Sequence, residues 1–436
     1  MTSLDSKPEL IQPPRGTHDI LPEESPQWQY LENTARNIIQ DAGYGEIRVP
    51  VFEHTELFKR GVGEDTDIVN KEMYTFTDRS GRSLTLRPEG TAGAVRAYLS
   101  GGLHRQSPPV KLWYTGPMMR YERPQAGRQR QFHQIGVEAF GSEGPLIDAE
   151  VIFLGTELLK KLELSGLELK LNSIGCPDCR PLYKAELLKV LSHRLKELCT
   201  DCQERFQSNP LRMLDCKNEN CQAQYHDVPT SLDHLCKNCQ QHWDELLQLV
   251  SKFGIKHTVD HRLVRGLDYY TRTVFEILTN DPRLKAQSTV LGGGRYDYLV
   301  ETLGGPHTPA VGWALGMERL ILLSKQSNPQ IVFAFVVSPD PARALDLALT
   351  IRQAGISCDL DYPPEGNSAR GLSRQLQQAN KSGAGWAVIA TDDEWSTGQV
   401  LLKNLKTSSQ EKISSQDLVK FLTANFNQKI KTSCPG

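Results

Sequence analysis

The chemistry that this sequence could perform is concentrated in three arginine-containing segments. In the first, MRYERPQAGRQRQFHQIGVEAFG, Arg120 and Glu122 are two residues apart, so on a strand their side chains share a face. A guanidinium can bind a phosphate through two parallel hydrogen bonds, and Phe132 could stack on a base. Glu138, on the returning strand, could reach the same face. This mixture suits a substrate with phosphates and an ammonium group, although a surface hairpin with cross-strand salt bridges would use the same residues.

The second segment, RLVRGLDYYTRTVFE, is dense in polar side chains next to an apolar strand. Arg265, Tyr269 and Tyr270 are close together in the sequence, and Gly266 indicates a special backbone angle beside Arg265. Tyrosines near a turn often only pack, yet the density of polar groups here favours a pocket.

The third segment, PAVGWALGMERLILL, runs from a glycine-spaced strand into an apolar helix. Arg319 is the lone cation in the apolar stretch of this helix, where an unpaired charge is costly. A phosphate ligand would pair it, and Glu318 or another carboxylate is the alternative partner. Nearby, Gly292–Gly294 lack the spacing of a dinucleotide-binding loop and the Lys-Ser/Thr of a phosphate loop. We interpret these glycines as a tight turn that lets the backbone approach a small ligand.

Cysteine is concentrated in one part of the chain. Eight of the ten cysteines lie between Cys176 and Cys239, in pairs separated by two or four residues, which are spacings that zinc ligands use. No signal-peptide pattern is seen, so disulfides are not expected. A structural zinc and simple buried or free thiols both remain open, and no catalytic metal is predicted. The pairs are Cys176/Cys179, Cys199/Cys202, Cys216/Cys221 and Cys236/Cys239.

The hydrophobic pattern indicates the elements that must position these residues. Residues 111–122 and 131–140 are predicted to form an antiparallel hairpin joined by an arginine-rich loop. Upstream, a helix capped by Ser25 precedes a strand at 46–53, which Pro50 restricts to an edge or an interface.

The second half of the chain shows two changes of pattern. Residues 176–254 are helical, charged and cysteine-rich, which indicates an insertion. After a linker at 324–330, strands and helices alternate, as in a small α/β domain with a largely parallel sheet. The expected fold is therefore α+β, with an antiparallel sheet flanked by helices, a helical insertion and a C-terminal α/β domain.

Composition excludes some classes of protein. A chain of 436 residues is too long for one compact core. No apolar run is long enough to span a membrane, and Met1–Pro14 lacks the apolar stretch of a signal peptide, so we expect a cytoplasmic protein. The net charge of −2 means that any RNA contact must come from local basic clusters.

Together these segments resemble the class II aminoacyl-tRNA synthetases, and specifically the histidyl-tRNA synthetase family. The first helix and the Pro50 strand look like the family's first motif, which forms a dimer interface. The first arginine segment looks like its second motif, and AVGWALGMERL looks like its third. The stretches RLVRGLDYYTRTVFE, RGTHDILPEE, TLRPEGTAG and GGGRYDYLVETLGG match the histidine-specific pattern. The resemblance covers residues 13–428.

The resemblance implies an architecture and a set of partners. It implies a homodimer that uses ATP with Mg²⁺ to activate L-histidine to histidyl-adenylate and then transfers it to the 3′ end of tRNA-His. Its parts would be a flexible extension at 1–13, a catalytic domain at 14–325 with the insertion at about 176–254, an anticodon-binding domain at 331–428 and a tail at 429–436.

The resemblance also implies roles for individual residues. Arg120 and Arg265 act at the α-phosphate, Arg120 also binds the histidine carboxylate, and Arg319 holds the γ-phosphate. Phe132 stacks on adenine, with Glu122 near its amino group. The remaining roles concern histidine: Glu89, Thr91 and Gln134 match its ammonium group, and Glu138, Tyr270 and the neighbouring Tyr269 match its imidazole.

Imidazole recognition by these residue types has a physical basis. The neutral ring has one donor and one acceptor. A carboxylate accepts from one nitrogen, and a tyrosine hydroxyl donates to the other. An analogue without these groups leaves both side chains unpaired, which gives discrimination of roughly 10⁴ or more in comparable sites.

Two other functions fit parts of the sequence. A non-catalytic paralogue that regulates histidine biosynthesis would bind histidine, but such paralogues typically lack both the Arg265 stretch and the C-terminal domain. A metal-stapled RNA-binding protein would use the cysteines, but it would not need Arg120, Arg265 and Arg319 together.

Overall fold

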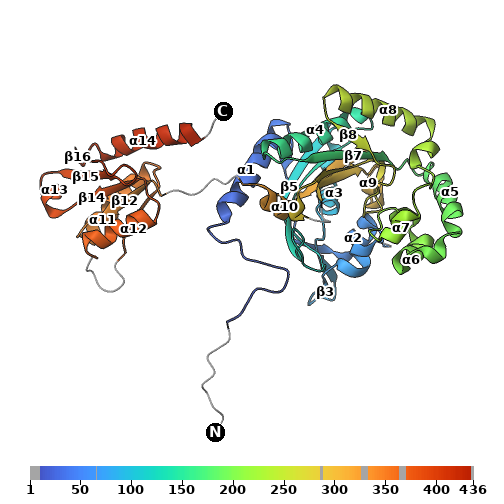
Figure 1. The fold of residues 1–436 in the computed structure, drawn as a ribbon, viewed down its shortest axis with the longest axis horizontal. Helices are drawn as coiled ribbons and strands as arrows, with labels where there is room; N and C mark the ends of the chain where they lie inside the picture. Colours follow the sequence, from blue (N-terminus) through green and yellow to red (C-terminus); the bar gives the residue numbers. More distant parts are fainter. Residues whose placement is uncertain (1–9, 65, 285–287, 326–331, 363–369, 434–436) are drawn as a thin grey trace, which may run out of the picture. The chain divides into compact units, whose positions relative to one another are not determined.

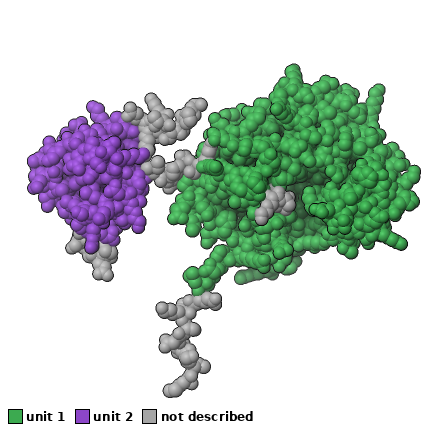
Figure 2. Space-filling model, viewed as in Figure 1, with its two compact units in different colours: residues 1–328 green, residues 329–436 purple. Residues whose placement is uncertain are grey.

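The chain forms two compact units, residues 1–328 and residues 329–436 (Figure 2). The computed structural model describes residues 10–64, 66–284, 288–325, 332–362 and 370–433. The linker expected at 324–330 spans the division between the units, and its residues 326–330 lie outside the described part of the chain, as does most of the expected N-terminal extension.

Unit 1 is built on an eight-stranded sheet of order β1-β5-β6-β11-β10-β9-β7-β8 (Figure 1). The strands from β5 to β7 in this order pair antiparallel, and the edge strands β1 and β8 pair parallel with their neighbours. The predicted antiparallel sheet is confirmed, and β5 and β6 form the predicted hairpin. The strands are β1 Gly45–Glu46, β5 Val110–Met119, β6 Gln131–Phe140, β7 Leu167–Ser173, β8 His257–Val259, β9 Thr271–Thr279, β10 Thr289–Arg295 and β11 Ala310–Gly316.

Helices cover one face of this sheet with apolar side chains. Trp113, Val137 and Trp313 share a buried core with these helices, because side chains alternate between the two faces of a strand. Ser25 is the first residue of α1 rather than its cap, and its hydroxyl donates to the Leu21 carbonyl, so the predicted cap is wrong. The covering helices are α1 Ser25–Asp41, α4 Pro145–Lys161, α8 Lys237–Lys252 and α10 Met317–Leu323.

The run Gly292–Gly294 belongs to a central strand, so the tight turn predicted there is wrong. Strand β10 pairs with both β9 and β11. A Cβ on Gly293 would lie 2.2 Å from the carbonyl oxygen of Gly312. These glycines therefore serve close approach to the backbone within a strand, which a glycine run can signal as well as a turn.

The single strand predicted at 46–53 is also wrong. Proline has no amide hydrogen to continue a ladder, and Pro50 separates two short strands that belong to different sheets. Strand β1 joins the large sheet, whereas β2 joins a small three-stranded sheet of order β2-β4-β3. The small sheet consists of β2 Phe52–His54, β3 Thr75–Thr77 and β4 Ser83–Leu86. Helix α2 Thr55–Val62 packs beside it, and α3 Thr91–Ser100 and α9 Leu299–Thr302 pack against α2.

The cysteine-rich segment is helical, as predicted. It contains α5 Arg180–Ser192, α6 Thr200–Ser208, α7 Glu219–Ala223 and α8. Helix α8 packs against α4, so the last helix of the insertion belongs to the layer that covers the sheet (Figure 1). Among the described residues, no helix is long and apolar enough to cross a membrane.

Unit 2 contains a five-stranded sheet of order β13-β12-β14-β15-β16. The first three strands are parallel, as predicted, but β15 and β16 add an antiparallel hairpin that the sequence analysis did not predict. Helix α14 continues to Ser433, past the expected domain end at 428. The elements are β12 Ala334–Val337, α11 Pro341–Gln353, β13 Cys358–Leu360, α12 Leu372–Lys381, β14 Trp386–Ile389, α13 Asp392–Ser396, β15 Gln399–Asn404, β16 Gln410–Ser414 and α14 Leu418–Ser433.

Candidate active site

The second face of the large sheet carries little side-chain bulk and forms the floor of the candidate site. The polar side chains of Gln134, Glu138 and Glu276 belong to this face, by the register of β6, β9 and their neighbours. The ring of Tyr114 lies over Gly136, where a Cβ would approach it to 2.3 Å. The small residues of the floor are Gly136, Gly292, Gly294, Gly312 and Ala314.

Glu138 is buried in the centre of this floor, and hydroxyl groups surround its carboxyl group. It accepts hydrogen bonds from Thr91 Oγ1 at 2.8 Å and from the Tyr114 hydroxyl at 3.3 Å. The Tyr296 hydroxyl also donates to it. Burial raises the pKa of Glu138 to about 8, against the opposing effect of these hydrogen bonds. Burial therefore favours the neutral form of this carboxyl group in the ligand-free protein.

Glu89 fixes the start of α3 beside Glu138. Its two carboxylate oxygens accept from the main-chain amides of Thr91 at 2.7 Å and Ala92 at 2.8 Å, which are first-turn amides without a partner in the helix. Burial raises the pKa of Glu89, while these hydrogen bonds and Arg120 oppose the rise. The structure thus places Glu89, Thr91 and Glu138 together.

Arg265 and Tyr270 lie directly against the glycine strand. A Cβ on Gly292 would lie 2.4 Å from the Arg265 guanidinium, and one on Gly294 would lie 2.8 Å from the Tyr270 ring. Arg265 donates to Glu276, and its guanidinium carbon is 5.9 Å from the centre of the Tyr270 ring. Bulk at either glycine would displace these side chains from the floor.

Arg120, Glu122 and Phe132 lie together at the end of the hairpin. Arg120 Nε donates to the Pro88 carbonyl at 2.8 Å, and the guanidinium carbon is 5.4 Å from the centre of the Phe132 ring. Glu122 lies 3.9 Å from Arg120 and forms an ion pair with Arg128. Burial lowers the pKa of Arg120.

Four guanidinium groups converge beside the floor. Burial is the largest influence on Arg319 and, with repulsion from Arg128, Arg120 and Arg265, it lowers the pKa of this residue to about 10, while Glu276 opposes the change. Positive charges that repel one another in this way favour the binding of an anion that carries several negative charges.

Glu318 is occupied with a partner of its own beside the arginine cluster. It accepts from the main-chain nitrogen of His133 at 2.8 and 3.0 Å. Arg319 itself donates to the carbonyls of Gly127, at 3.3 Å, and Thr289.

Gln134 and Tyr269 complete the surroundings of the histidine-specific residues. The side-chain oxygen of Gln134 is buried and has no hydrogen-bond partner among the described residues, which is unfavourable unless a ligand supplies a donor. The ring of Tyr269 is 4.7 Å from that of Tyr270 and 5.6 Å from that of Tyr296.

Four residues of this arrangement were not predicted: Tyr114, Tyr296, Glu276 and Arg128. The hairpin pattern could have indicated Tyr114, because Tyr114 pairs with Gly136, two residues before Glu138. Glu276 and Tyr296 lie within the quoted family stretches, but the face of each depends on pairing between distant strands.

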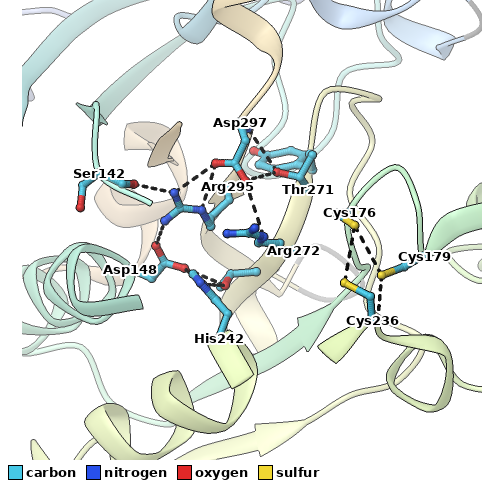
Figure 3. Close-up of polar contacts among 12 residues, drawn as sticks. Ser142, Asp148, Cys176, Cys179, Cys236, His242, Thr271, Arg272, Arg295 and Asp297 are labelled. Atoms are coloured by element: carbon cyan, nitrogen blue, oxygen red, sulfur yellow. Dashed lines mark hydrogen bonds and ion pairs between the residues drawn. The ribbon is translucent and has the colours of Figure 1, made fainter. Parts of the chain in front are cut away.

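A buried ionic network supports the sheet from its helical face (Figure 3). Arg295 is fully buried and forms ion pairs with Asp148 and Asp297. Asp148 also accepts from His242 Nε2 at 2.8 Å and Thr273 Oγ1 at 2.7 Å. The network therefore joins β9 and β10 to α4 and α8, and it holds the last helix of the insertion against the sheet.

A cavity of about 230 Å³ opens beside Arg265 and Tyr270, towards the insertion. Its lining includes three further cations, Arg180, Lys184 and Arg212. The space next to the arginine cluster is therefore basic on the side of the insertion as well.

Comparison with known proteins agrees with this arrangement. Residues 16–320 match the family described as Histidyl-tRNA synthetase, and residues 330–425 match the family described as Anticodon binding domain. The histidine–tRNA ligase of Desulforamulus reducens is 48% identical over 419 residues, covering 94% of this chain and 98% of that protein. That of Pelotomaculum thermopropionicum is 49% identical over 417 residues, with 94% and 96% covered. The crystal structure of apo histidyl-tRNA synthetase from S. aureus has a TM-score of 0.80 at 35% identity and covers 95% of this chain and all of that one.

Replacing Glu138 with Gln should remove a pH-dependent loss of stability from the ligand-free protein. The pKa of about 8 in the folded state exceeds the ordinary 4.5, so between these values the unfolded carboxyl loses its proton while the folded one retains it. The contribution of Glu138 to the free energy of unfolding is therefore largest below about pH 4.5, and it is lost as the pH rises to about 8. Through that window the free energy of unfolding of the wild type should fall, relative to Glu138→Gln, by roughly 1.4 kcal/mol per pH unit.

Urea unfolding of ligand-free protein at about pH 5 and about pH 8 measures this difference. Glu168→Gln, exposed on β7, is the control, and its difference from the wild type should be the same at both pH values. An equally constant difference for Glu138→Gln would mean that Glu138 is not buried as described.

Proposed function

The chain belongs to the histidyl-tRNA synthetase family, and from this premise we propose which residues carry each step of its reaction. Its activity is that of a histidine–tRNA ligase of class II: histidine and ATP form histidyl-adenylate, and the histidyl group passes to tRNA. The non-catalytic paralogue is disfavoured, because the ligase relatives cover nearly the whole chain and the anticodon-binding domain is present. Since charged tRNA is used in translation, the proposed location is the cytoplasm.

The observation that carries the residue assignment is the convergence of four guanidiniums beside a buried carboxyl pocket on one sheet face. Arg120 and Arg265 bind the α-phosphate, Arg120 also binds the histidine carboxylate, and Arg319 binds the γ-phosphate. As a carboxylate oxygen attacks the α-phosphorus and pyrophosphate leaves, negative charge gathers on the α-phosphate oxygens. Guanidiniums that are already fixed in place stabilise that charge without reorganising.

Glu276 holds Arg265 in position before substrates bind. Its carboxylate accepts from Arg265 and, at 2.8 Å, from Thr289 Oγ1. Mg²⁺ accompanies ATP in this family and takes oxygen ligands, usually one or two carboxylates together with substrate phosphates. Glu276 is the carboxylate beside the arginines that fits this requirement. When bound, the ion would add positive charge at the phosphates.

Histidine binds at the Glu138 end of the floor. Glu138 and Tyr270 contact the imidazole nitrogens, with Tyr269 alongside. The ammonium group of the histidine substrate supplies three donors. The buried oxygen of Gln134, which has no partner among the described residues, is an acceptor for one of them. Glu89 and Thr91 provide the remaining contacts to the ammonium group, since Thr91 contacts Glu138 and Glu89 accepts from the amide of Thr91.

Adenine binds at the hairpin end of the floor. Phe132 stacks on the base, and Arg120, over the same ring at 5.4 Å, keeps the base next to the phosphate site. Glu122 accepts from the adenine amino group while its ion pair with Arg128 fixes its orientation.

Arg265→Ala should reduce histidine-dependent pyrophosphate–ATP exchange by about 10³-fold or more, because a fixed positive charge at the reacting phosphate is lost. Arg265→Lys should also be strongly impaired, since a point charge does not replace a planar fork. Arg262→Ala, an exposed arginine three residues away that contacts Gln222, is the matched control and should exchange normally. Near wild-type exchange by a folded Arg265→Ala protein would remove the assigned role.

Unit 2 is proposed to bind the tRNA anticodon. Its core is formed by its own residues. Near the end of β13 it has a cavity of about 380 Å³, lined in part by Tyr362, Arg370 and Lys381. Aromatic and basic side chains together are suited to unpaired bases and their phosphates.

A chain ending at residue 325 should therefore still form histidyl-adenylate but charge tRNA poorly. All the adenylation residues lie in unit 1, so pyrophosphate exchange should stay within about twofold of the full chain, while the KM for tRNA should rise by about tenfold or more. Aminoacylation assays with purified tRNA measure this split. Equal charging by both chains would contradict the assignment of unit 2.

A homodimer is also proposed, through the strand part of the surface that the sequence indicated rather than through the helix. The apolar face of α1 is not available, because Trp28 and Leu31 are buried in the core of their own unit. On the neighbouring small sheet, Phe52 is 49% exposed and Phe76 is 44% exposed, with ring centres 6.4 Å apart. Exposed paired aromatics on a short sheet are typical of an interface.

Sedimentation of the wild type at micromolar concentration should give about twice the 48.9 kDa chain mass. Phe52→Ser combined with Phe76→Ser should shift it towards the monomer, because the interface loses its aromatic anchors. Leu182→Ser, at an exposed apolar position on α5, should leave the dimer intact. A monomeric wild type would contradict the homodimer, and an unchanged double variant would contradict this surface.

A further inference from the structure

The insertion brings its eight cysteines together in two groups of four. Within each group the sulfur atoms all lie within 4.8 Å of one another. The first and last pairs along the chain combine, and the two middle pairs combine. The junction set is Cys176, Cys179, Cys236 and Cys239, and the distal set is Cys199, Cys202, Cys216 and Cys221.

The distances between the sulfur atoms match the edges of a metal-centred tetrahedron. The Sγ atoms of Cys176 and Cys179 are 3.5 Å apart, and those of Cys176 and Cys236 are 4.0 Å apart. In the distal set, Cys199 and Cys216 are separated by 3.8 Å. A disulfide needs about 2.05 Å, whereas four ~2.3 Å zinc–sulfur bonds in a tetrahedron place the sulfurs about 3.8 Å apart.

Main-chain amides in both sets donate to sulfur atoms. The amide of Cys236 donates to Cys179 Sγ at 3.1 Å, and that of Cys199 donates to Cys221 Sγ at 3.2 Å. Amide donors favour a thiolate over a thiol, and such contacts orient metal ligands.

The junction set has little apolar packing of its own. Among the described residues, its buried thiols pack with one another and with Leu235 and Cys236. The rest of the helical lobe has an apolar core, which includes Leu187, Leu191 and Met213. The junction is therefore the part of the lobe to which a bound ion would add most stability.

We propose that each set binds one Zn²⁺ as a tetrathiolate, so that the chain carries two structural zinc ions. Soft thiolate ligands in a tetrahedron select zinc or iron over magnesium and calcium. Sulfur atoms this close together surround a single ion rather than a cluster. Because four protein ligands fill the tetrahedron, neither ion has an open position for water or substrate. The proposal does not rest on the assigned catalytic roles.

Both ions hold the insertion against the loop that carries Arg265 and Tyr270. In the junction set, Cys179 directly precedes Arg180, which donates to the main-chain carbonyl of Tyr270. In the distal set, Cys216 follows Arg212, which donates to the carbonyl of Gly266 at 3.0 Å. Figure 3 draws three of the junction cysteines. Gly175, which precedes Cys176, accepts from the amide of Arg272, and Arg272 forms an ion pair with Asp297 of the buried network.

The full-length protein, purified without added metal, should contain two zinc ions per chain by elemental analysis. Cys176→Ser and Cys199→Ser should each retain one, because each removes a ligand from a different set. Cys358→Ala, at a buried cysteine of unit 2, is the control and should retain two.

Thiol titration of the native wild type decides the proposal even if the serine variants do not fold. The eight insertion cysteines should react only after a chelator removes the metal, with release of two zinc ions. Zinc below one per chain with freely reacting thiols would overturn the proposal, as would iron in stoichiometric amount. A single zinc per chain would overturn the claim of two sites.

Discussion

The small residues at the centre of one face of the large sheet determine how closely other groups can approach its backbone. Gly292 and Gly294 leave room for Arg265 and Tyr270 to lie against β10, and a single methyl group at either position would collide with them. In the same way Gly312 makes room for the carboxyl group of Glu138. Substrate can therefore sit one side-chain layer above the strands, with arginines and carboxylates converging on it from the floor and from the surrounding loops.

Glycines contribute no side-chain packing, so the stability of these floor strands must come mainly from the other face of the sheet. There the alternate residues of the same strands are large, and Trp313 and Phe275 pack under α4 and its neighbours. Arg295 adds a buried ionic network that joins two floor strands to two helices. Removing one partner of such a network leaves a buried charge without compensation, which is strongly unfavourable. The network thus fixes the register of the strands and the orientation of the insertion's last helix.

The sequence predicted those features that depend on local pattern. The β5–β6 hairpin, the helical insertion and the parallel strands of unit 2 all have a clear periodicity or a continuous apolar run. It failed where one local signal has two physical explanations. The Gly292–Gly294 run is compatible with a turn or a floor strand, and the apolar face of α1 does not reveal whether its own core or a partner covers it. Glu276 and Tyr296 were missed because register between distant strands decides which face a residue occupies.

The ligand-free site is electrostatically incomplete in two opposite ways, and this favours the substrate orientation that we propose. At one end guanidiniums repel one another, and burial together with that repulsion lowers the pKa of Arg319. At the other end burial favours the neutral form of Glu138. A triphosphate relieves the first imbalance, and a donor or cation relieves the second. Histidine carries a ring with a donor at one end and a carboxylate at the other. If the ring lies at Glu138, the carboxylate is directed to the arginines, which is where we propose that the α-phosphate binds and is attacked.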